Sequence, residues 1–176
     1  MKKSLFTLLF LFTLIVAAKA QDDQQNHTAL SVGPEIGFPS RTQFNLGYGG
    51  SLKFETPVIN NFGVSVSGGF TQLSYKRIAF GSGSKPSPAN FIPLKAGVIY
   101  YAGPARLEGE LGTVLEQQEV NGMKQSLFVF SLGPSFLIPL GESKNQHINL
   151  GVRYENWSSN TLRMVAIRVA YHLGLN

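Results

Sequence analysis

The sequence predicts an all-β fold, namely an eight-stranded antiparallel up-and-down transmembrane β-barrel. Eight segments that alternate apolar and polar residues follow an N-terminal export signal, and the connections between them alternate in length. No segment after the signal approaches the roughly 20 apolar residues of a transmembrane helix. Because an open sheet leaves unpaired backbone groups in lipid, strands that cross a membrane must close into a barrel.

Residues 1–20 are predicted to be a secretory signal peptide. They contain its three parts: the basic residues Lys2 and Lys3, the apolar run Leu5–Val16, and the small-x-small cleavage site Ala18-Lys19-Ala20. The alternative, a retained membrane anchor, is disfavoured because the apolar run is short. We therefore expect a flexible lead-in at 21–27 and a single barrel domain at 28–176.

The composition excludes several classes of function. Loss of the signal removes three of the 15 Lys and Arg residues, which leaves 12 basic against 10 acidic residues. The mature chain then carries a charge near +2 and no basic run, so we expect no nucleic-acid partner. The chain has no cysteine, which excludes disulfides, thiolate catalysis and cysteine metal sites.

The first four strand-like segments each place apolar residues on one parity, as expected where successive side chains point to opposite faces of a sheet. Their ranges are Thr28–Phe38, Phe44–Thr56, Phe62–Tyr75 and Phe91–Tyr101. In the second, Leu46, Tyr48, Leu52 and Phe54 alternate with Gly47, Gly49, Ser51, Lys53 and Glu55.

The last four segments continue the pattern. Their ranges are Ala105–Glu116, Ser126–Ile138, His147–Trp157 and Met164–Leu175. The final segment is the clearest, because its apolar parity is uninterrupted while the other parity carries Arg168, His172 and small residues. Its length suits a tilted strand that crosses a bilayer.

The connections predict the orientation of the barrel. Outer-membrane barrels have short periplasmic turns and longer external loops. The short connections Pro57–Asn61 and Ala102–Pro104 would be periplasmic, whereas the long polar connection Lys76–Asn90 and Gln117–Gln125 would be external. Pro139–Gln146 is longer than this rule prefers for a periplasmic turn.

Three prolines fall inside predicted strands, at Pro34, Pro93 and Pro134. Proline cannot donate a backbone hydrogen bond to a neighbouring strand, so we expect a local irregularity at each position. Two of these prolines follow glycine, in Val32-Gly33-Pro34 and Leu132-Gly133-Pro134.

The polar parity predicts a network of charges inside the barrel. It comprises Glu35, Lys53, Glu55, Lys95, Arg106, Glu108, Glu110, Arg153, Glu155 and Arg168. Unpaired buried charges are unfavourable, so these side chains should pair with one another, Arg168 with Glu35 or Glu155. An eight-stranded barrel is just wide enough for side chains to fill, which favours a structural plug over a narrow or gated pore.

We find no catalytic, cofactor or metal site in the sequence. Glu108 and Glu110 share a face and could act as acid and base, but membership of the lumen network explains them better. A lipid-modifying barrel would need Ser, His and an acid near the external rim. The histidines are His27, His147 and His172, the last two on the periplasmic side, and they are too scattered for a metal site.

A soluble lipocalin- or avidin-like barrel in the periplasm is the main alternative, because it would place the apolar parity inside around a ligand. The polar parity is rich in Gly and Ser and too poor in charge for a good soluble surface, which favours the membrane barrel. Aromatic residues near strand ends then suggest two girdles at the membrane interfaces. They are Phe38, Phe44, Phe54, Phe62, Tyr75, Phe91, Tyr100, Tyr101, Tyr154, Trp157 and Tyr171.

On these features the chain resembles the small eight-stranded outer-membrane β-barrels of Gram-negative bacteria, the OmpA/OmpX-like group. The resemblance covers residues 28–176 and rests on architecture rather than a short motif. It implies a cell outer-membrane location, membrane-lipid contact, insertion by the barrel-assembly machinery and a monomeric state. Such barrels usually end on an aromatic residue, whereas this chain ends on Asn176.

The expected role is structural, adhesive or in surface interaction, without enzymatic activity. Lys76, Arg77 and Lys85 make the longer external loop basic. Basic side chains attract anionic groups, so the phosphates of lipopolysaccharide are candidate partners for this loop.

Overall fold

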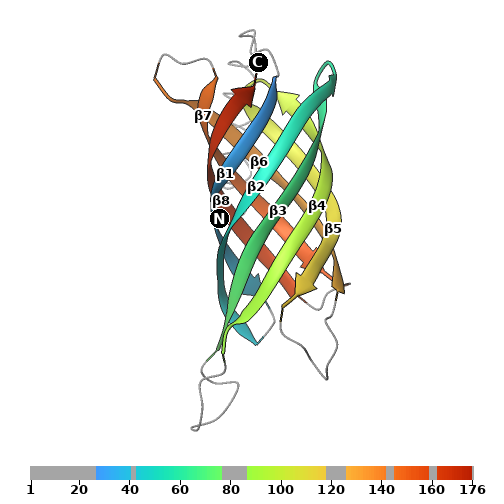
Figure 1. The fold of residues 1–176 in the computed structure, drawn as a ribbon, viewed down its shortest axis with the longest axis vertical. Coiled ribbons are helices and arrows are strands. Elements are labelled where there is room, and N and C mark those ends of the chain that lie inside the picture. Colours follow the sequence, from blue (N-terminus) through green and yellow to red (C-terminus); the bar gives the residue numbers. More distant parts are fainter. Residues whose placement is uncertain are drawn as a thin grey trace, which may run out of the picture.

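A computed structural model shows one closed antiparallel barrel of eight strands, in which each strand pairs with its neighbours in sequence and β8 pairs with β1 (Figure 1). The structure describes residues 27–40, 43–76, 87–117, 126–141, 145–158 and 162–175. The strands are β1 (Thr28–Ser40), β2 (Phe44–Ile59), β3 (Phe62–Tyr75), β4 (Ala89–Ala102), β5 (Ala105–Glu116), β6 (Ser126–Pro139), β7 (Gln146–Trp157) and β8 (Leu162–Leu175).

The predicted fold class is confirmed. Each expected segment forms a strand, and most strands extend slightly beyond the predicted range, β4 beginning at Ala89 and β8 at Leu162. Within the described residues no helix is long and apolar enough to cross a membrane. The predicted signal peptide and residue Asn176 lie outside the described residues.

The barrel has two unlike ends. Thr28 pairs with Leu175 at one end of the closing β1–β8 seam, and Ser40 pairs with Arg163 at the other. We call the first the turn end, because the strands there are joined through 60–61, 103–104 and 140–145. The second is the loop end, where the connections run through 41–43, 76–88, 117–125 and 158–161.

The apolar side chains point outward and the charged parity points inward. Val66 and Leu111 are 62% and 59% exposed, and large apolar residues on every strand are similarly exposed. In contrast Lys53, Glu110 and Glu155 are buried. A soluble ligand-binding barrel requires the opposite arrangement, so the orientation of the side chains contradicts the lipocalin- or avidin-like alternative.

Polar side chains form a collar on the outer face near the loop end. Its members pair across neighbouring strands: Tyr48, Gln72 and Asn90 on β2–β4, Thr113 and Ser126 on β5 and β6, and Asn156, Arg163 and Ser40 on β7, β8 and β1. Gln72 accepts a hydrogen bond from the Tyr48 hydroxyl and donates one to Asn90 Oδ1 at 2.8 Å.

The collar marks one edge of an apolar belt. On β8 the outward side chains run apolar from Val165 to Leu175. At about 3.4 Å per residue and a tilt of about 40°, this stretch spans about 26 Å along the barrel axis. That height matches the apolar band of transmembrane barrels, which is about 25 Å.

The predicted aromatic girdles are only partly correct. Phe38, Phe62 and Tyr100 lie on the exposed outer face. Phe91, Tyr101 and Trp157 instead point inward and are at most 4% exposed. Phe44 and Tyr75 also pack against the inner apolar cluster, with ring centroids 4.7 Å apart. A strand-end aromatic can therefore face lipid or lumen, depending on its parity.

Each of the three strand prolines interrupts the pairing with one neighbouring strand, as predicted. No pairs with β8 are formed at Gly33 and Pro34, and none with β7 at Gly133 and Pro134. Pro93 lies in a similar interruption between β3 and β4. Pairing on the opposite side continues, for example Pro34 with Gly50. The two Gly-Pro dipeptides thus occupy equivalent structural positions.

Candidate functional site: the charged lumen

The lumen consists of three layers along the barrel axis. An apolar cluster closes the loop end, a set of charged side chains occupies the middle, and a mixed group of Tyr, Arg, Glu and His side chains lies at the turn end. Every second side chain of a strand points into the lumen. These inward side chains are apolar near the loop end and charged toward the centre, and this change produces the layers.

Eight charged side chains in the middle layer form one chain of ion pairs with alternating sign, which we call the lumen ion chain. In order it contains Arg168, Glu35, Arg153, Glu155, Lys95, Glu110, Lys53 and Glu108. Its members come from β8, β1, β7, β4, β5 and β2. Because these strands lie on different sides of the barrel, the chain crosses the lumen.

The distances along the lumen ion chain are those of direct contacts. Arg168 Nε lies 3.3 Å from Glu35 Oε1, and Arg153 Nη1 donates to the same oxygen at 3.0 Å. Glu155 Oε1 accepts from Arg153 Nε at 2.6 Å and from Lys95 Nζ at 2.9 Å. Lys95 Nζ also lies 2.8 Å from Glu110 Oε2.

The second half of the chain joins β2 to β5. Lys53 Nζ lies 3.5 Å from Glu110 Oε1 and pairs directly with Glu108. Neither partner could be identified from the sequence, because the register around the whole barrel decides which residues of β2 and β5 share a level.

Hydroxyl groups satisfy the carboxylate oxygens of the lumen ion chain. Ser67 and Ser131 each donate to Glu110 at 2.8 Å, and Ser65 donates to Glu108 at 2.7 Å. Buried carboxylates with several donors are far better tolerated than bare ones. The Ser residues of the polar parity therefore complete the hydrogen bonding of the charges.

The apolar layer at the loop end, which we call the lumen seal, was not recognised in the sequence. It comprises Leu73, Ala89, Phe91, Val114, Val129, Trp157, Leu162 and Met164, none more than 4% exposed. The rings of Phe91 and Trp157 meet edge to face with centroids 5.2 Å apart. Trp157 Nε1 also donates to Glu155 Oε2 at 3.1 Å, which ties the lumen seal to the lumen ion chain.

The turn end carries the remaining predicted charges. Arg106 pairs with Glu55, and the Arg106 guanidinium lies 5.1 Å from the ring centroid of Tyr101. His172 Nε2 lies 3.8 Å from Glu55 Oε1, and the His147 and His172 rings are 5.9 Å apart. The two histidines, expected to be scattered, are thus cross-strand neighbours. Among the described residues, no group of three or more His, Asp or Glu side chains is arranged so that it could hold a metal ion.

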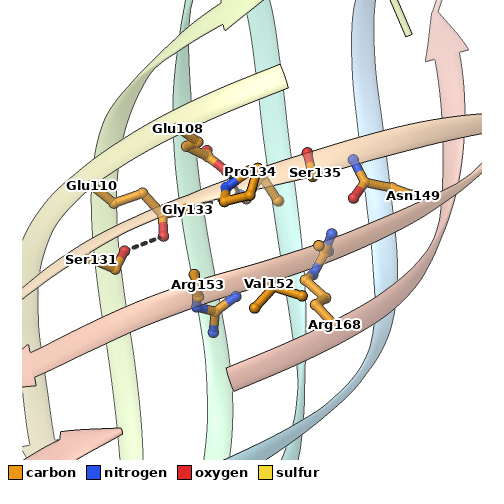
Figure 2. Close-up of a pocket in the computed structure, with 12 residues that line it drawn as sticks. Glu108, Glu110, Ser131, Gly133, Pro134, Ser135, Asn149, Val152, Arg153 and Arg168 are labelled. Atoms are coloured by element: carbon orange, nitrogen blue, oxygen red, sulfur yellow. Dashed lines mark hydrogen bonds and ion pairs between the residues drawn. The ribbon is translucent and has the colours of Figure 1, made fainter. Parts of the chain in front are cut away.

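The middle layer contains small cavities. A cavity of about 30 Å³ lies between Lys53, Glu108, Glu110, Arg153 and Arg168 and the small residues of β6. Figure 2 shows it with the hydrogen bond between Ser131 and Glu110. A water molecule needs about 10–15 Å³, so this cavity has room for a few waters and not for a substrate.

The structure places all ten predicted lumen residues on the inner face. Arg168 contacts Glu35, while Glu155, the other expected partner, contacts Lys95 and Arg153. Glu108 and Glu110, considered as an acid and base, are each paired with lysine. Of the predicted loop residues, Lys76 is exposed at the loop end, and Arg77 and Lys85 lie outside the described residues.

The barrel is similar to solved structures of small outer-membrane proteins. No protein-family model matches the sequence, and neither does any curated protein sequence. The crystal structure of Ail, the attachment invasion locus protein of Yersinia pestis, matches with a TM-score of 0.53 and 16% identity, covering 84% of this chain and 99% of Ail. The chain has the fold of a small outer-membrane β-barrel.

Two further structures share this outer-membrane barrel fold. Ail of Yersinia pestis in a phospholipid bilayer nanodisc matches with a TM-score of 0.56 and 14% identity, over 86% of this chain and 100% of that one. Neisserial surface protein A matches with a TM-score of 0.56 and 13% identity, over 84% and 97%. At this low sequence identity, the structural similarity shows a shared fold and nothing further.

Proposed function

We propose that this protein is a non-enzymatic barrel of the cell outer membrane, with a side-chain-plugged lumen and a structural, adhesive or surface-interaction role. The observation that carries the proposal is the inverted distribution of side chains. Apolar residues cover the outside, and a neutral, internally paired set of charges fills the inside beneath the lumen seal.

The outer face supports insertion into a membrane. The exposed apolar belt spans about 26 Å, the height expected of a transmembrane barrel. Closure of β1 onto β8 leaves no free sheet edge in lipid. In the proposed orientation the turn end faces the periplasm and the loop end faces outward.

The arrangement of the inner face supports a plugged lumen. The lumen ion chain links strands on different sides of the barrel, and the lumen seal covers it toward the loop end. Ion flow would require breaking several buried ion pairs and wetting an apolar layer. The surface at the loop end is the part of the protein proposed to interact with partners. Its basic residues Lys76, Arg77 and Lys85 are proposed to attract anionic groups such as lipopolysaccharide phosphates.

Membrane fractionation with heat-modifiable gel mobility tests the location. We expect the protein in the outer-membrane fraction, migrating faster unheated than heated. Recovery in the soluble periplasmic fraction without a mobility shift would contradict the proposal.

Planar-bilayer recording tests the plugged lumen. Discrete conductance steps from purified protein would favour a pore instead.

The interaction role is tested by shortening the longest connection. A deletion of 82–87 stops before Ala89, which belongs to β4 and is buried in the lumen seal. Loop tips tolerate such changes, so the variant should keep its mobility shift while losing binding to lipopolysaccharide. Unchanged binding would place the interaction elsewhere on the surface.

A further inference from the structure

The seam that closes the barrel contains one of the three proline interruptions. Pairing between β1 and β8 runs from Thr28–Leu175 to Val32–Tyr171, and resumes at Glu35–Arg168. Between these stretches Pro34 has no N–H to donate. The closing seam therefore lacks a backbone hydrogen bond near its centre, at a depth where lipid offers no water as a substitute.

Arg168 bridges this interruption from inside the barrel. Its Nη2 donates to Ser31 Oγ at 3.1 Å and to the Ser31 carbonyl at 3.2 Å, on one side of the interruption. Its Nε lies 3.3 Å from Glu35 Oε1 on the other side. The same side chain reaches β2, where Nε donates to Ser51 Oγ at 2.9 Å.

The chemistry of the guanidinium explains why arginine can serve here. Five N–H donors in a rigid planar fork can bind several acceptors at once, whereas a lysine ammonium is a compact point charge. Arg168 is 4% exposed, so its bonds are made away from bulk water. Glu35 compensates its charge and also accepts from Ser51.

The other two interruptions are built differently. Beside Gly133 and Pro134 lies the cavity of about 30 Å³, and Arg153, which faces this interruption from β7, forms ion pairs with Glu35 and Glu155. A smaller cavity of about 10 Å³ adjoins Pro93. The bridged interruption is the one on the seam that joins the first strand to the last.

We propose that Arg168 is a latch for the β1–β8 seam, replacing with side-chain bonds the cohesion that Pro34 removes from the backbone. The seam is then the part of the wall that opens first when the latch is lost. This inference concerns the barrel wall and does not depend on the partner or role of the external loops.

Six variants test the latch: Arg168→Gln and Arg168→Lys, each alone and each combined with either Pro34→Ala or Pro134→Ala. Pro34→Ala restores an N–H at the seam. Pro134→Ala restores one at an interruption that Arg168 does not bridge, so it is the matched control. Two measurements apply: the temperature at which the folded gel form disappears, and amide hydrogen exchange resolved by strand in lipid.

We expect Arg168→Gln to lose its folded form about 10 °C below wild type, as for a broken buried ion pair. Pro34→Ala should return roughly 3 °C more than Pro134→Ala in that background. Faster amide exchange should be confined to β1 and β8. Equal rescue by both proline variants, or acceleration spread over all strands, would overturn the latch.

If Arg168→Gln does not fold, Arg168→Lys carries the test. It keeps the charge for Glu35 but has a single nitrogen in place of the separate Nε and Nη2 donors that bind Ser51 and Ser31. Faster exchange of β1 and β8 in this variant, reversed by Pro34→Ala and not by Pro134→Ala, supports the latch. Wild-type exchange at the seam would show that charge alone holds it and would refute the proposal.

Discussion

Lys95 stands in the middle of the lumen ion chain, between Glu155 on β7 and Glu110 on β5. It is 6% exposed, and its ammonium group neutralises part of two carboxylates. Removal of one partner from a buried ion pair is much more damaging than replacement of the whole pair, because the other charge stays buried and uncompensated.

Replacement of Lys95 by Met should therefore lower the free energy of unfolding by about 3–5 kcal/mol. Because methionine has about the same volume as the aliphatic part of the lysine side chain, the loss of stability measures the effect of removing the charge. Urea unfolding in lipid or detergent measures it, with Lys76→Met at the exposed loop end as the control expected to change little. Addition of Glu110→Gln to Lys95→Met should recover part of the loss. Additive effects of the two substitutions would argue against their direct coupling.

Trp157 gives a direct test of the lumen seal, because it is the only tryptophan of the chain. It is 1% exposed and faces the lumen. Its fluorescence should resist quenchers attached to lipid acyl chains. In the double variant Trp157→Phe with Tyr154→Trp, the indole moves to the 39% exposed position of Tyr154 on the outer face, where strong quenching is expected. Strong quenching of the wild type would place Trp157 in lipid.

At the scale of the strands, glycine controls how closely the wall packs at the interruption between β6 and β7. A Cβ at Gly133 would collide with the backbone carbonyl of Val152 and the Cα of Arg153. A Cβ at Gly109, on β5, would meet only Leu132 Cδ1, at 3.8 Å. Since backbone atoms cannot move aside as a side-chain end can, the two positions should differ in tolerance.

Gly133→Ala should accordingly destabilise the barrel by about 1–3 kcal/mol, the range typical of overpacking. Gly109→Ala is the matched control and should be neutral within about 0.5 kcal/mol, as most surface changes are. Unfolding midpoints of both variants in the same lipid provide the comparison. Equal tolerance at the two positions would show that the strands can separate at Gly133.

The strands could be predicted from the sequence because a half-buried strand leaves an alternating pattern that needs no tertiary information. The three proline interruptions were predictable for the same reason, since the missing donor is a property of the residue. The inward position of Phe91 and Trp157 could not be predicted, because aromatic residues near strand ends are also typical of membrane interfaces. The apolar side chains that close a lumen are of the same residue types, so composition does not distinguish the two positions.

Across the whole molecule, the pairing of the charges depends on barrel geometry. Lys53 meets Glu108 from β2 and β5, strands separated by two others. Which residues share a level is set by tilt and stagger, which no local pattern records. The sequence could therefore supply the ten charged residues of the lumen, but only one of their pairings, that of Arg168 with Glu35.

The paired charges inside the barrel balance, with five carboxylates and five Lys or Arg groups. Salt screens exposed charges far more than buried ones. An increase of salt from about 0.01 M to about 1 M should thus leave the unfolding midpoint nearly constant. The binding of the loop end to anionic surfaces that we propose should weaken strongly in the same series, which serves as the control. A large fall of the midpoint would show that the lumen charges are open to solvent.

The lumen ion chain also bears on the order in which the barrel is made. Glu35 is synthesised with the first strand, whereas Arg153 and Arg168, its two partners, belong to the last two. A nascent barrel that lacks β7 and β8 holds an acidic group whose ion pairs, among the described residues of the finished structure, are both made to those two missing strands. Early insertion of such an intermediate into lipid is unfavourable. The charge pattern is therefore expected to disfavour membrane insertion of the barrel before its last two strands have been made.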